Sequence, residues 1–309
     1  MNVTIQENES YRAFVSEVAQ QMGVFDFQPE QIVWHYTNGA GFLGIIESAT
    51  IRATQVASLN DKGETKYATD LYKEAIHEVL KDKADDAEAV GFLKMVLEFV
   101  KDEPESPAHG ASKFFVVCFS GDEDELTQWD RYCKPNGYAL GFVARGLYRE
   151  PNSQLYRVVY DRTKQLNATK RIAAATLDFY REGLTGDRLE NPSEWGKIFI
   201  EAWDEWVYKL APLAKDSKWK SENEYRLVHE LKVSEIPNLR FIQKPSMPGH
   251  YAWIVFVTCK QVAVEVVVTR VTVSTVSYIA VDCSISGTVA QWLFLQDFEP
   301  VTERKKKMR

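Results

Sequence analysis

The chain has 309 residues, of which 45% are hydrophobic and 12% aromatic, so it can bury a sizeable core as one large domain or two ordinary ones. Its formal net charge of -7 at pH 7 rules out an overall electrostatic attraction to nucleic acid but is compatible with a local basic groove. The N-terminal residues lack the basic and apolar regions of a signal peptide, and no apolar run approaches the roughly 20 residues that span a bilayer. We therefore expect a soluble, cytoplasmic protein without a membrane segment.

Four cysteines, Cys118, Cys133, Cys259 and Cys283, lie far apart and form no C-x-x-C pair. Cys118 and Cys259 lie within apolar runs of strand length, where a buried, reduced thiol is the ordinary expectation. The five histidines are scattered, and the H-x-E and paired-cysteine spacings of zinc sites are absent from the sequence. We therefore expect no metal site of that kind.

The first third of the chain predicts helices and strands in alternation. Apolar residues at helical spacing favour an amphipathic helix over residues 11–22. The stretch Ile32–Thr37 is typical of an apolar strand, and the glycines after it predict a turn into another helix. A short strand is expected at 51–54, and two charged helices are expected from 64 to about 100, joined near 82–86.

The remaining elements follow the same kinds of pattern. The continuous apolar run 113–120 predicts a central strand covered on both faces. Further strands are expected at 138–143, 155–160, 252–259, 262–275 and 278–281, and further helices at 126–132, 163–183 and 193–213. No internal repeat, low-complexity linker or clean boundary divides the sequence, so we interpret residues 1–309 as a single domain.

His35 ends the first predicted strand, beside a strand-to-helix turn. A histidine there can hold a ligand with one ring nitrogen while the protein orients it through the other; a satisfied structural histidine is the alternative. Because side chains alternate along a strand, Thr37 is expected to share the ligand-facing side with His35, and Tyr36 is expected to face the core.

Acidic residues at two predicted helix starts have a structural and a catalytic interpretation. Asp61 and Glu64 have the spacing of a helix N-cap and its N3 acid, and the acids of 122–125 suit the dipole of the helix that follows them. The same carboxylates could hold Mg²⁺ in a nuclease. Against that alternative, helix capping already explains these acids.

Three charged residues alternate in the sequence Glu-Asn-Glu-Tyr-Arg. On a strand, Glu222, Glu224 and Arg226 would project from one face. Tyr225 and Leu227 would then face the core. The charges form either a solvated edge or the wall of a cleft, where a carboxylate stabilises a developing positive charge.

Six short motifs occur in order: His35-Tyr36-Thr37, Leu59-Asn60-Asp61-x-x-Glu64, Cys118-Phe119-Ser120, Trp129-x-x-Tyr132, Gly141-Phe142 and Glu222-x-Glu224-x-Arg226. Together they resemble a bacterial family catalogued as domain of unknown function 2971 (DUF2971), often found near phage-defence and toxin genes. The resemblance covers about Val33 to Val228. That family in turn resembles the ADP-ribosyltransferase superfamily, especially the branch whose toxins modify nucleic-acid bases, which opens with a His-x-Thr strand and carries a late catalytic Glu.

The resemblance implies a fold and a reaction. The fold would be α+β, with a split mixed or antiparallel β-sheet core of ADP-ribosyltransferase type and helical insertions at about 64–101 and 163–213. NAD would be a substrate, cleaved at its nicotinamide–ribose bond through an oxocarbenium-like transition state, and nucleic acid would be the acceptor, RNA in preference to DNA. A toxin or phage-defence effector of this kind is expected to have an antitoxin or chaperone protein as partner.

The resemblance also implies roles for single residues. Glu224 would hold the ribose 2′-hydroxyl and stabilise the cation, with Glu222 as the alternative. His35 would hydrogen-bond the ribose, supported by Thr37. The other NAD contacts would be nicotinamide stacking on Tyr67 or Tyr132 and pyrophosphate binding by Arg52 and Arg226.

Two other functions stay open: the metal-dependent nuclease and a non-catalytic nucleotide-sensing module of a defence system. An acidic protein that modifies nucleic acid also needs a local basic surface. The densest internal candidates are Arg157, Arg162, Lys164, Lys170 and Arg171, which could equally form a solvated helix face.

Overall fold

The computed structural model describes residues 9–48, 50–56, 62–99, 114–133, 137–147, 153–196, 211–230, 240–243 and 251–258. The strands are β1 (Ile32–Asn38), β2 (Thr50–Gln55), β3 (Phe114–Ser120), β4 (Gly137–Val143), β5 (Ser153–Arg157), β6 (Glu224–Glu230), β7 (Arg240–Gln243) and β8 (Tyr251–Thr258). The α-helices are α1 (Glu9–Met22), α2 (Gly39–Ser48), α3 (Lys62–Asp82), α4 (Ala87–Phe99), α5 (Leu126–Tyr132), α6 (Ala144–Leu147) and α7 (Arg162–Gly183). Short 3₁₀ helices span Gly186–Leu189, Ala211–Leu213 and Ser217–Glu222.

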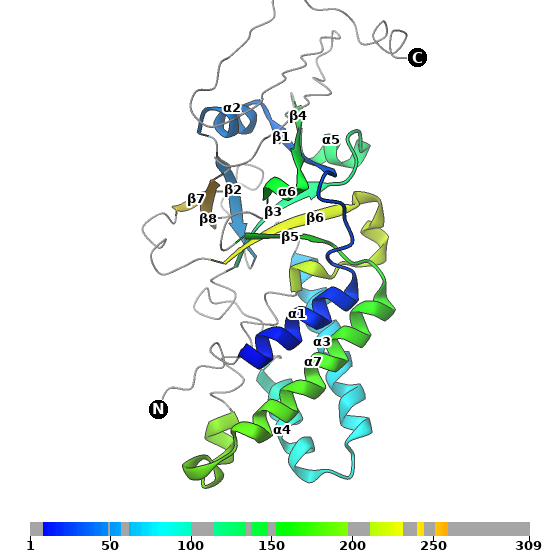
Figure 1. The fold of residues 1–309 in the computed structure, drawn as a ribbon, viewed down its shortest axis with the longest axis vertical. Coiled ribbons are helices and arrows are strands. Elements are labelled where there is room, and N and C mark those ends of the chain that lie inside the picture. The colour runs from blue at the N-terminus through cyan, green and yellow to red at the C-terminus, as the bar shows by residue number, and fades with distance from the viewer. Residues whose placement is uncertain are drawn as a thin grey trace, which may run out of the picture.

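One curled, eight-stranded sheet forms the centre of the protein, and helices pack around it (Figure 1). Its main path runs β4-β1-β3-β2-β8-β7, while β6 pairs with both β3 and β5. All of these strand pairs are antiparallel. The prediction of an α+β fold with an antiparallel sheet is confirmed.

Strand β3 is the branch point of the sheet. One of its edges pairs with β6 over the whole strand, from Phe114 to Ser120. The other edge meets β1 at Ser120 and β2 at Phe115 and Val116, so β1 and β2 diverge along residues 117–119. The sheet therefore forks at this edge of β3.

The apolar run of β3 is covered on both faces, as its sequence predicts. Phe115, Val117 and Phe119 pack in one core with residues of β1, β2, β4, β5 and β6, beside α2 and α6. Phe114 and Val116 pack on the other face, against a layer formed by α1, α3, α4 and α7 (Figure 1). Each face of the sheet thus has its own hydrophobic core.

The helical layer follows from apolar residues at helical spacing. On α3, Tyr72, Ile76 and Val79 are buried against the layer's core, and on α7 Ile172 and Leu177 are buried in the same core. The predicted helices at 11–22, 64–100 and 163–183 are confirmed within one to three residues at most ends, including the break near 82–86. Within the described ranges, no helix is long and apolar enough to cross a bilayer.

Some predicted elements differ from the structure. The strand expected at 155–160 ends at Arg157, after which Val159 forms an isolated parallel bridge with Ala214. The helix expected at 193–213 does not continue as an α-helix to its end, because 211–213 is a 3₁₀ turn that feeds this bridge. The strands predicted at 262–275 and 278–281, and the N-cap predicted at Asp61, lie outside the described residues.

Candidate functional site

A cavity of about 520 Å³ opens where the sheet forks. Strands β1, β2, β3 and β6 line it, together with α5 and the segment 215–222. The face of β3 that presents Phe114 to the helical layer carries Cys118 and Ser120 toward the fork, where they line the cavity. Small-molecule sites in proteins have volumes of this size.

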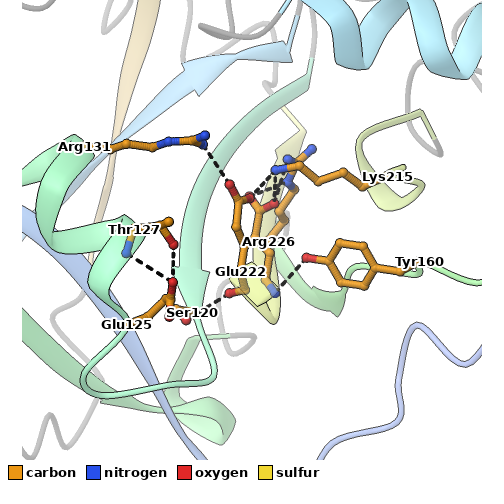
Figure 2. A network of polar contacts seen from close by, with 9 residues as sticks. Ser120, Glu125, Thr127, Arg131, Tyr160, Lys215, Glu222 and Arg226 are labelled. Atoms are coloured by element: carbon orange, nitrogen blue, oxygen red, sulfur yellow. Dashed lines mark hydrogen bonds and ion pairs between the residues drawn. The ribbon is translucent and has the colours of Figure 1, made fainter. Parts of the chain in front are cut away.

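Two buried carboxylates in the lining are held by three cations; we call these five residues the carboxylate network. Glu222 and Glu224 both accept hydrogen bonds from Nζ of Lys215, which lies 2.9 Å from Oε2 of Glu224. Arg226 donates from Nε and Nη2 to the two oxygens of Glu224, at 2.8 and 2.9 Å. Arg131 donates to Oε1 of Glu222 at 2.9 Å, and Figure 2 shows Arg131 and Lys215 reaching Glu222 from opposite sides.

Glu222 is not on a strand, and the prediction that placed it there is wrong. It ends the 3₁₀ helix Ser217–Glu222, and Asn223 then adopts a left-handed backbone conformation with φ of 41° before β6 begins. Asparagine tolerates this conformation better than most residues. The Ser120 hydroxyl donates to the Glu222 carbonyl at 2.9 Å, which fixes the turn against β3. This turn, rather than strand alternation, brings the two carboxylates together.

Glu224 is an anion that its surroundings satisfy completely. Burial raises its pKa, but Arg226 and Lys215 outweigh burial and hold the pKa at about 2, with a further hydrogen bond from the Cys118 thiol. Two bonds from Arg226, one from Lys215 and one from Cys118 occupy the roughly four acceptor positions of a carboxylate. From the described residues Glu222 accepts one hydrogen bond at each oxygen, from Arg131 and Lys215, which leaves an acceptor position on each oxygen.

Cationic and aromatic side chains complete the lining. The guanidinium carbon of Arg131 lies 4.6 Å from the ring centroid of Trp219, a cation–π contact. Tyr132 lines the cavity and is 47% exposed. Arg52 on β2 is exposed, and among the described residues it has no ion-pair partner. Four cations against two carboxylates favour an anionic ligand, and the aromatic faces suit a planar ring.

His35 borders the cavity, but the register of the sheet places it on the opposite face from Glu224. Trp34 pairs with Ser120, which in turn pairs with Glu224, so these three residues share one face. Because side chains alternate, Tyr36 also belongs to that face and His35 does not. His35 and Tyr36 thus both line the cavity, from opposite faces of the sheet, and Tyr36 also packs in a buried cluster with Trp129, as expected of a core-facing residue.

His35 instead contacts β3 at the point where β1 and β2 diverge. Its Nδ1 lies 2.9 Å from the carbonyl oxygen of Cys118, within the stretch of β3 that neither β1 nor β2 pairs. Its ring packs edge-on against Phe119, with 5.7 Å between centroids. Burial lowers the pKa of His35, which favours the neutral ring. A neutral imidazole donating from Nδ1 replaces the missing backbone hydrogen bond.

The predicted NAD-binding residues divide into two groups. Arg52 and Tyr132 line the cavity, whereas Thr37 and Tyr67 lie outside its lining. Tyr67, on α3, donates to Oε1 of Gln165 on α7 at 2.6 Å and so joins two helices. Tyr67 therefore lies in the helical layer and not at this cavity, which leaves Tyr132 as the predicted stacking residue that lines it.

Arg226 lines the cavity but is not available for a pyrophosphate. It is 2% exposed, and its guanidinium donates to both oxygens of Glu224 and, at 2.8 Å, to the carbonyl oxygen of Pro212. These contacts make it a support for the carboxylate. The predicted role as a phosphate contact does not fit this geometry.

Three residues of the site escaped the sequence analysis: Lys215, Trp219 and Arg131. Lys215 and Trp219 precede Glu222 in one short segment, and this proximity in sequence was a weak indication that they belong to the same site. Arg131 directly precedes Tyr132 on α5. They were not predicted because a single cation on a short helix or in a loop belongs to no periodic pattern, so the sequence does not indicate where its side chain points.

Two of the four acids of 122–125 have structural roles. Glu125 caps α5 by accepting from the backbone N–H of Thr127 at 3.1 Å, and Asp124 accepts from the indole of Trp129 at 2.9 Å. Among the residues that the structure describes, no group of three or more His, Cys, Asp or Glu could hold a metal ion. Asp61 lies outside them.

The basic residues predicted as a nucleic-acid surface are largely neutralised by neighbouring acids. The ion pairs join Arg162 to Glu74, Lys170 to Glu78 and Arg171 to Glu17. The alternative of a solvated helix face describes these residues better.

Comparison with known proteins identifies one related family. Residues 128–227 match the family model described as "Protein of unknown function (DUF2971)". All five residues of the carboxylate network lie within this range, which supports the resemblance to that family. No curated protein sequence and no solved structure matches the chain.

Proposed function

We propose that the cavity binds NAD and that the chain is an NAD-dependent ADP-ribosyltransferase, with a split sheet of that superfamily's type. The observation that carries the proposal is the pair of buried, salt-bridged carboxylates in a cavity that cationic and aromatic side chains also line. A carboxylate fixed in a desolvated site stabilises a developing oxocarbenium ion. Cations and aromatic faces suit the phosphates and rings of a dinucleotide.

The reaction is a glycosyl transfer from NAD. The bond between C1′ of the ribose and the nicotinamide nitrogen breaks, and its electron pair stays on that nitrogen, which neutralises the pyridinium. Positive charge develops on C1′ and the ring oxygen of the ribose, where a carboxylate stabilises it. A nucleophile of the acceptor then bonds to C1′ and loses its proton.

Glu222 is the better candidate for contact with the ribose. With respect to the described residues, its two oxygens each keep an acceptor position, whereas those of Glu224 are filled by Arg226, Lys215 and Cys118. Ligand binding at Glu222 therefore breaks no existing hydrogen bond. Glu224 serves as the fixed anion behind it.

The remaining lining residues match the other parts of NAD. Arg52 is available for the pyrophosphate, and Arg131 keeps further N–H donors beyond its single bond to Glu222. Tyr132, which is 47% exposed, offers a face for nicotinamide or adenine, while Trp219 holds the guanidinium of Arg131 over its ring. His35 supports this wall from the fork rather than binding the ribose directly.

For the acceptor we propose nucleic acid, RNA in preference to DNA, in the setting of a toxin or phage-defence effector with an antitoxin or chaperone partner. This part rests on the resemblance of the ordered motifs to toxins of the ADP-ribosyltransferase superfamily. The cationic lining of the cavity is compatible with a phosphate-bearing acceptor.

The test is incubation of the purified protein with labelled NAD and with RNA, DNA or cell lysate, while nicotinamide release and label transfer are measured. We expect release in the wild type and a loss of about 10²-fold or more in Glu222→Gln, the scale for removal of one electrostatic stabiliser. Glu78→Gln, the same change in a surface pair with Lys170, is the matched control and should retain activity.

Each outcome decides between functions. No nicotinamide release and no NAD binding by the folded protein would refute the proposal. NAD binding without release, unchanged in Glu222→Gln, would favour the nucleotide-sensing module. Chelator-sensitive cleavage of nucleic acid without NAD would favour the nuclease.

A further inference from the structure

We infer that Lys215 is a positioning residue, whose ammonium group keeps Glu222 and Glu224 charged and side by side in the cavity. The contacts that carry this inference are independent of NAD, but its importance for catalysis rests on the function proposed above. Lys215 would act through the carboxylates and touch neither the ribose nor the leaving group.

Nζ of Lys215 bridges the two carboxylates. Lys215 is 6% exposed, and its ammonium group donates to Oε2 of Glu222 and to Oε2 of Glu224. Two carboxylates within reach of one nitrogen repel each other, and without a cation such a pair tends to share a proton. Arg226 also stabilises the charge of Glu224 and Arg131 that of Glu222, but Lys215 offsets the repulsion between the two carboxylates because it contacts both.

The main chain of Lys215 is held firmly. Its N–H donates to the carbonyl of Val159 at 3.1 Å, and its carbonyl accepts from Nε2 of Gln165 at 2.9 Å. Gln165 is 0% exposed and also donates to the carbonyl of Val159 at 2.6 Å, while its Oε1 accepts from Tyr67. The helical layer thus fixes the backbone from which the ammonium group reaches the cavity.

The other two cations of the network each make their ion pair with a single carboxylate. Arg226 bonds to Glu224 and Arg131 bonds to Glu222. The other titratable groups around the pair are Cys118 on β3, Tyr132 on α5, Tyr160 after β5 and Arg52 on β2. Within the described part of the chain, Lys215 is the cation that contacts both carboxylates.

The test replaces the ammonium group and follows stability against pH. In Lys215→Met, one carboxyl should bind a proton in the folded state at a pH where it is ionised in the unfolded chain, whose reference pKa is 4.5. The folded state then binds more protons than the unfolded state, so stability falls as pH rises. Between pH 5 and 8 the folding equilibrium constant should drop relative to wild type by up to about tenfold per pH unit, the limit for one proton.

Two controls separate charge from packing. Lys215→Arg keeps a cation and should show no such pH dependence. Lys218→Met makes the same change in an exposed lysine beside the same Trp219 ring, and its stability difference from wild type should not vary with pH. A Lys215→Met difference that is equally large at every pH from 5 to 8 would overturn the inference.

If Lys215→Met does not fold at any pH, the double variant Lys215→Met/Glu222→Gln decides. Removal of one carboxylate removes the repulsion, so this variant should fold and show little pH dependence. Failure of the double variant to fold would also overturn the inference.

Nicotinamide release gives a second readout that separates the two ideas. If the wild type releases nicotinamide, the acid limb of the pH–rate profile in Lys215→Met should move to higher pH, which lost packing alone would not cause. If the wild type releases none, the proposed function fails while the stability measurements still test Lys215.

Discussion

The protein uses ion pairs in two regions that differ in their exposure to water. In the helical layer, pairs such as Lys170–Glu78 and Arg181–Glu88 join neighbouring helices with side chains that are 32–52% exposed. In the cavity, Lys215, Glu224 and Arg226 pair with side chains that are 2–7% exposed. The same residue types thus form solvent-exposed ion pairs in the helical layer and buried ion pairs in the cavity.

This difference decides what each group of pairs can do. Exposed pairs exchange water contacts for protein contacts at almost no net gain, and salt screens them. Buried pairs cost desolvation that only complete pairing offsets, so they are weak evidence for a role in stability alone. A protein that keeps two buried carboxylates and three cations beside a cavity has placed them where a ligand can use their charge.

The largest expected effect follows from loss of the most buried anion. Glu224→Gln keeps the size of the side chain but leaves Arg226 and Lys215 facing an uncharged amide. Removal of one partner from a buried pair costs about 3–5 kcal/mol, because the remaining charge is uncompensated. Urea unfolding at pH 7 should show this loss, and a change below about 1 kcal/mol would mean that water reaches the network freely.

Acid should remove the same contribution in the wild type. The pKa of Glu224 is lowered from 4.5 to about 2, so its stabilisation is fully present above pH 4.5 and is lost as pH falls toward 2. At 1.36 kcal/mol per pKa unit, this amounts to about 3 kcal/mol. The difference in unfolding free energy between wild type and Glu224→Gln should therefore shrink between pH 4.5 and 2. A constant difference across that interval would contradict the low pKa.

Glu222→Gln should cost less stability than Glu224→Gln, although we expect it to abolish NAD turnover. Its partner Arg131 is 42% exposed, so water can solvate the guanidinium once the carboxylate is gone. Lys215 keeps Glu224 as a counter-charge. We expect a loss of about 1–2 kcal/mol in urea unfolding, within the range for a hydrogen bond to a charged group. Equal losses for the two variants would remove the distinction between a ligand-facing and an anchoring carboxylate.

The fold was readable from the sequence where apolar periodicity was strong. The helices at 62–82 and 162–183, and strand β3, follow directly from it. The fork at β3 could not be predicted from the sequence, because it depends on which strands pair with the second edge of β3. Strand pairing joins residues far apart in the chain, and the pattern within one strand does not encode its neighbours.

The sequence predicted several residues of the site, but not the direction in which their side chains point. Glu222, Glu224, Arg52 and Tyr132, which the resemblance implied as site residues, all line the cavity. His35 lines the cavity from the opposite face of the sheet to Glu224, which the sequence did not reveal because alternation fixes which residues share a side but not which side meets the cavity. Glu222 reaches the site through a left-handed residue that no periodicity predicts.

The smallest effect on stability should come from the exposed ion pairs, and a large effect there would contradict the difference between exposed and buried pairs. Lys170→Met removes the partner of Glu78, and both groups remain open to water and salt. We expect no resolvable change in the urea midpoint, in contrast to the pH-dependent loss in Lys215→Met, which makes the same substitution in the cavity. Measurements at low and high salt sharpen the test, because any residual effect of Lys170 should vanish on screening. A loss as large as that of Lys215→Met would show that position in the fold, rather than burial, sets the strength of these pairs.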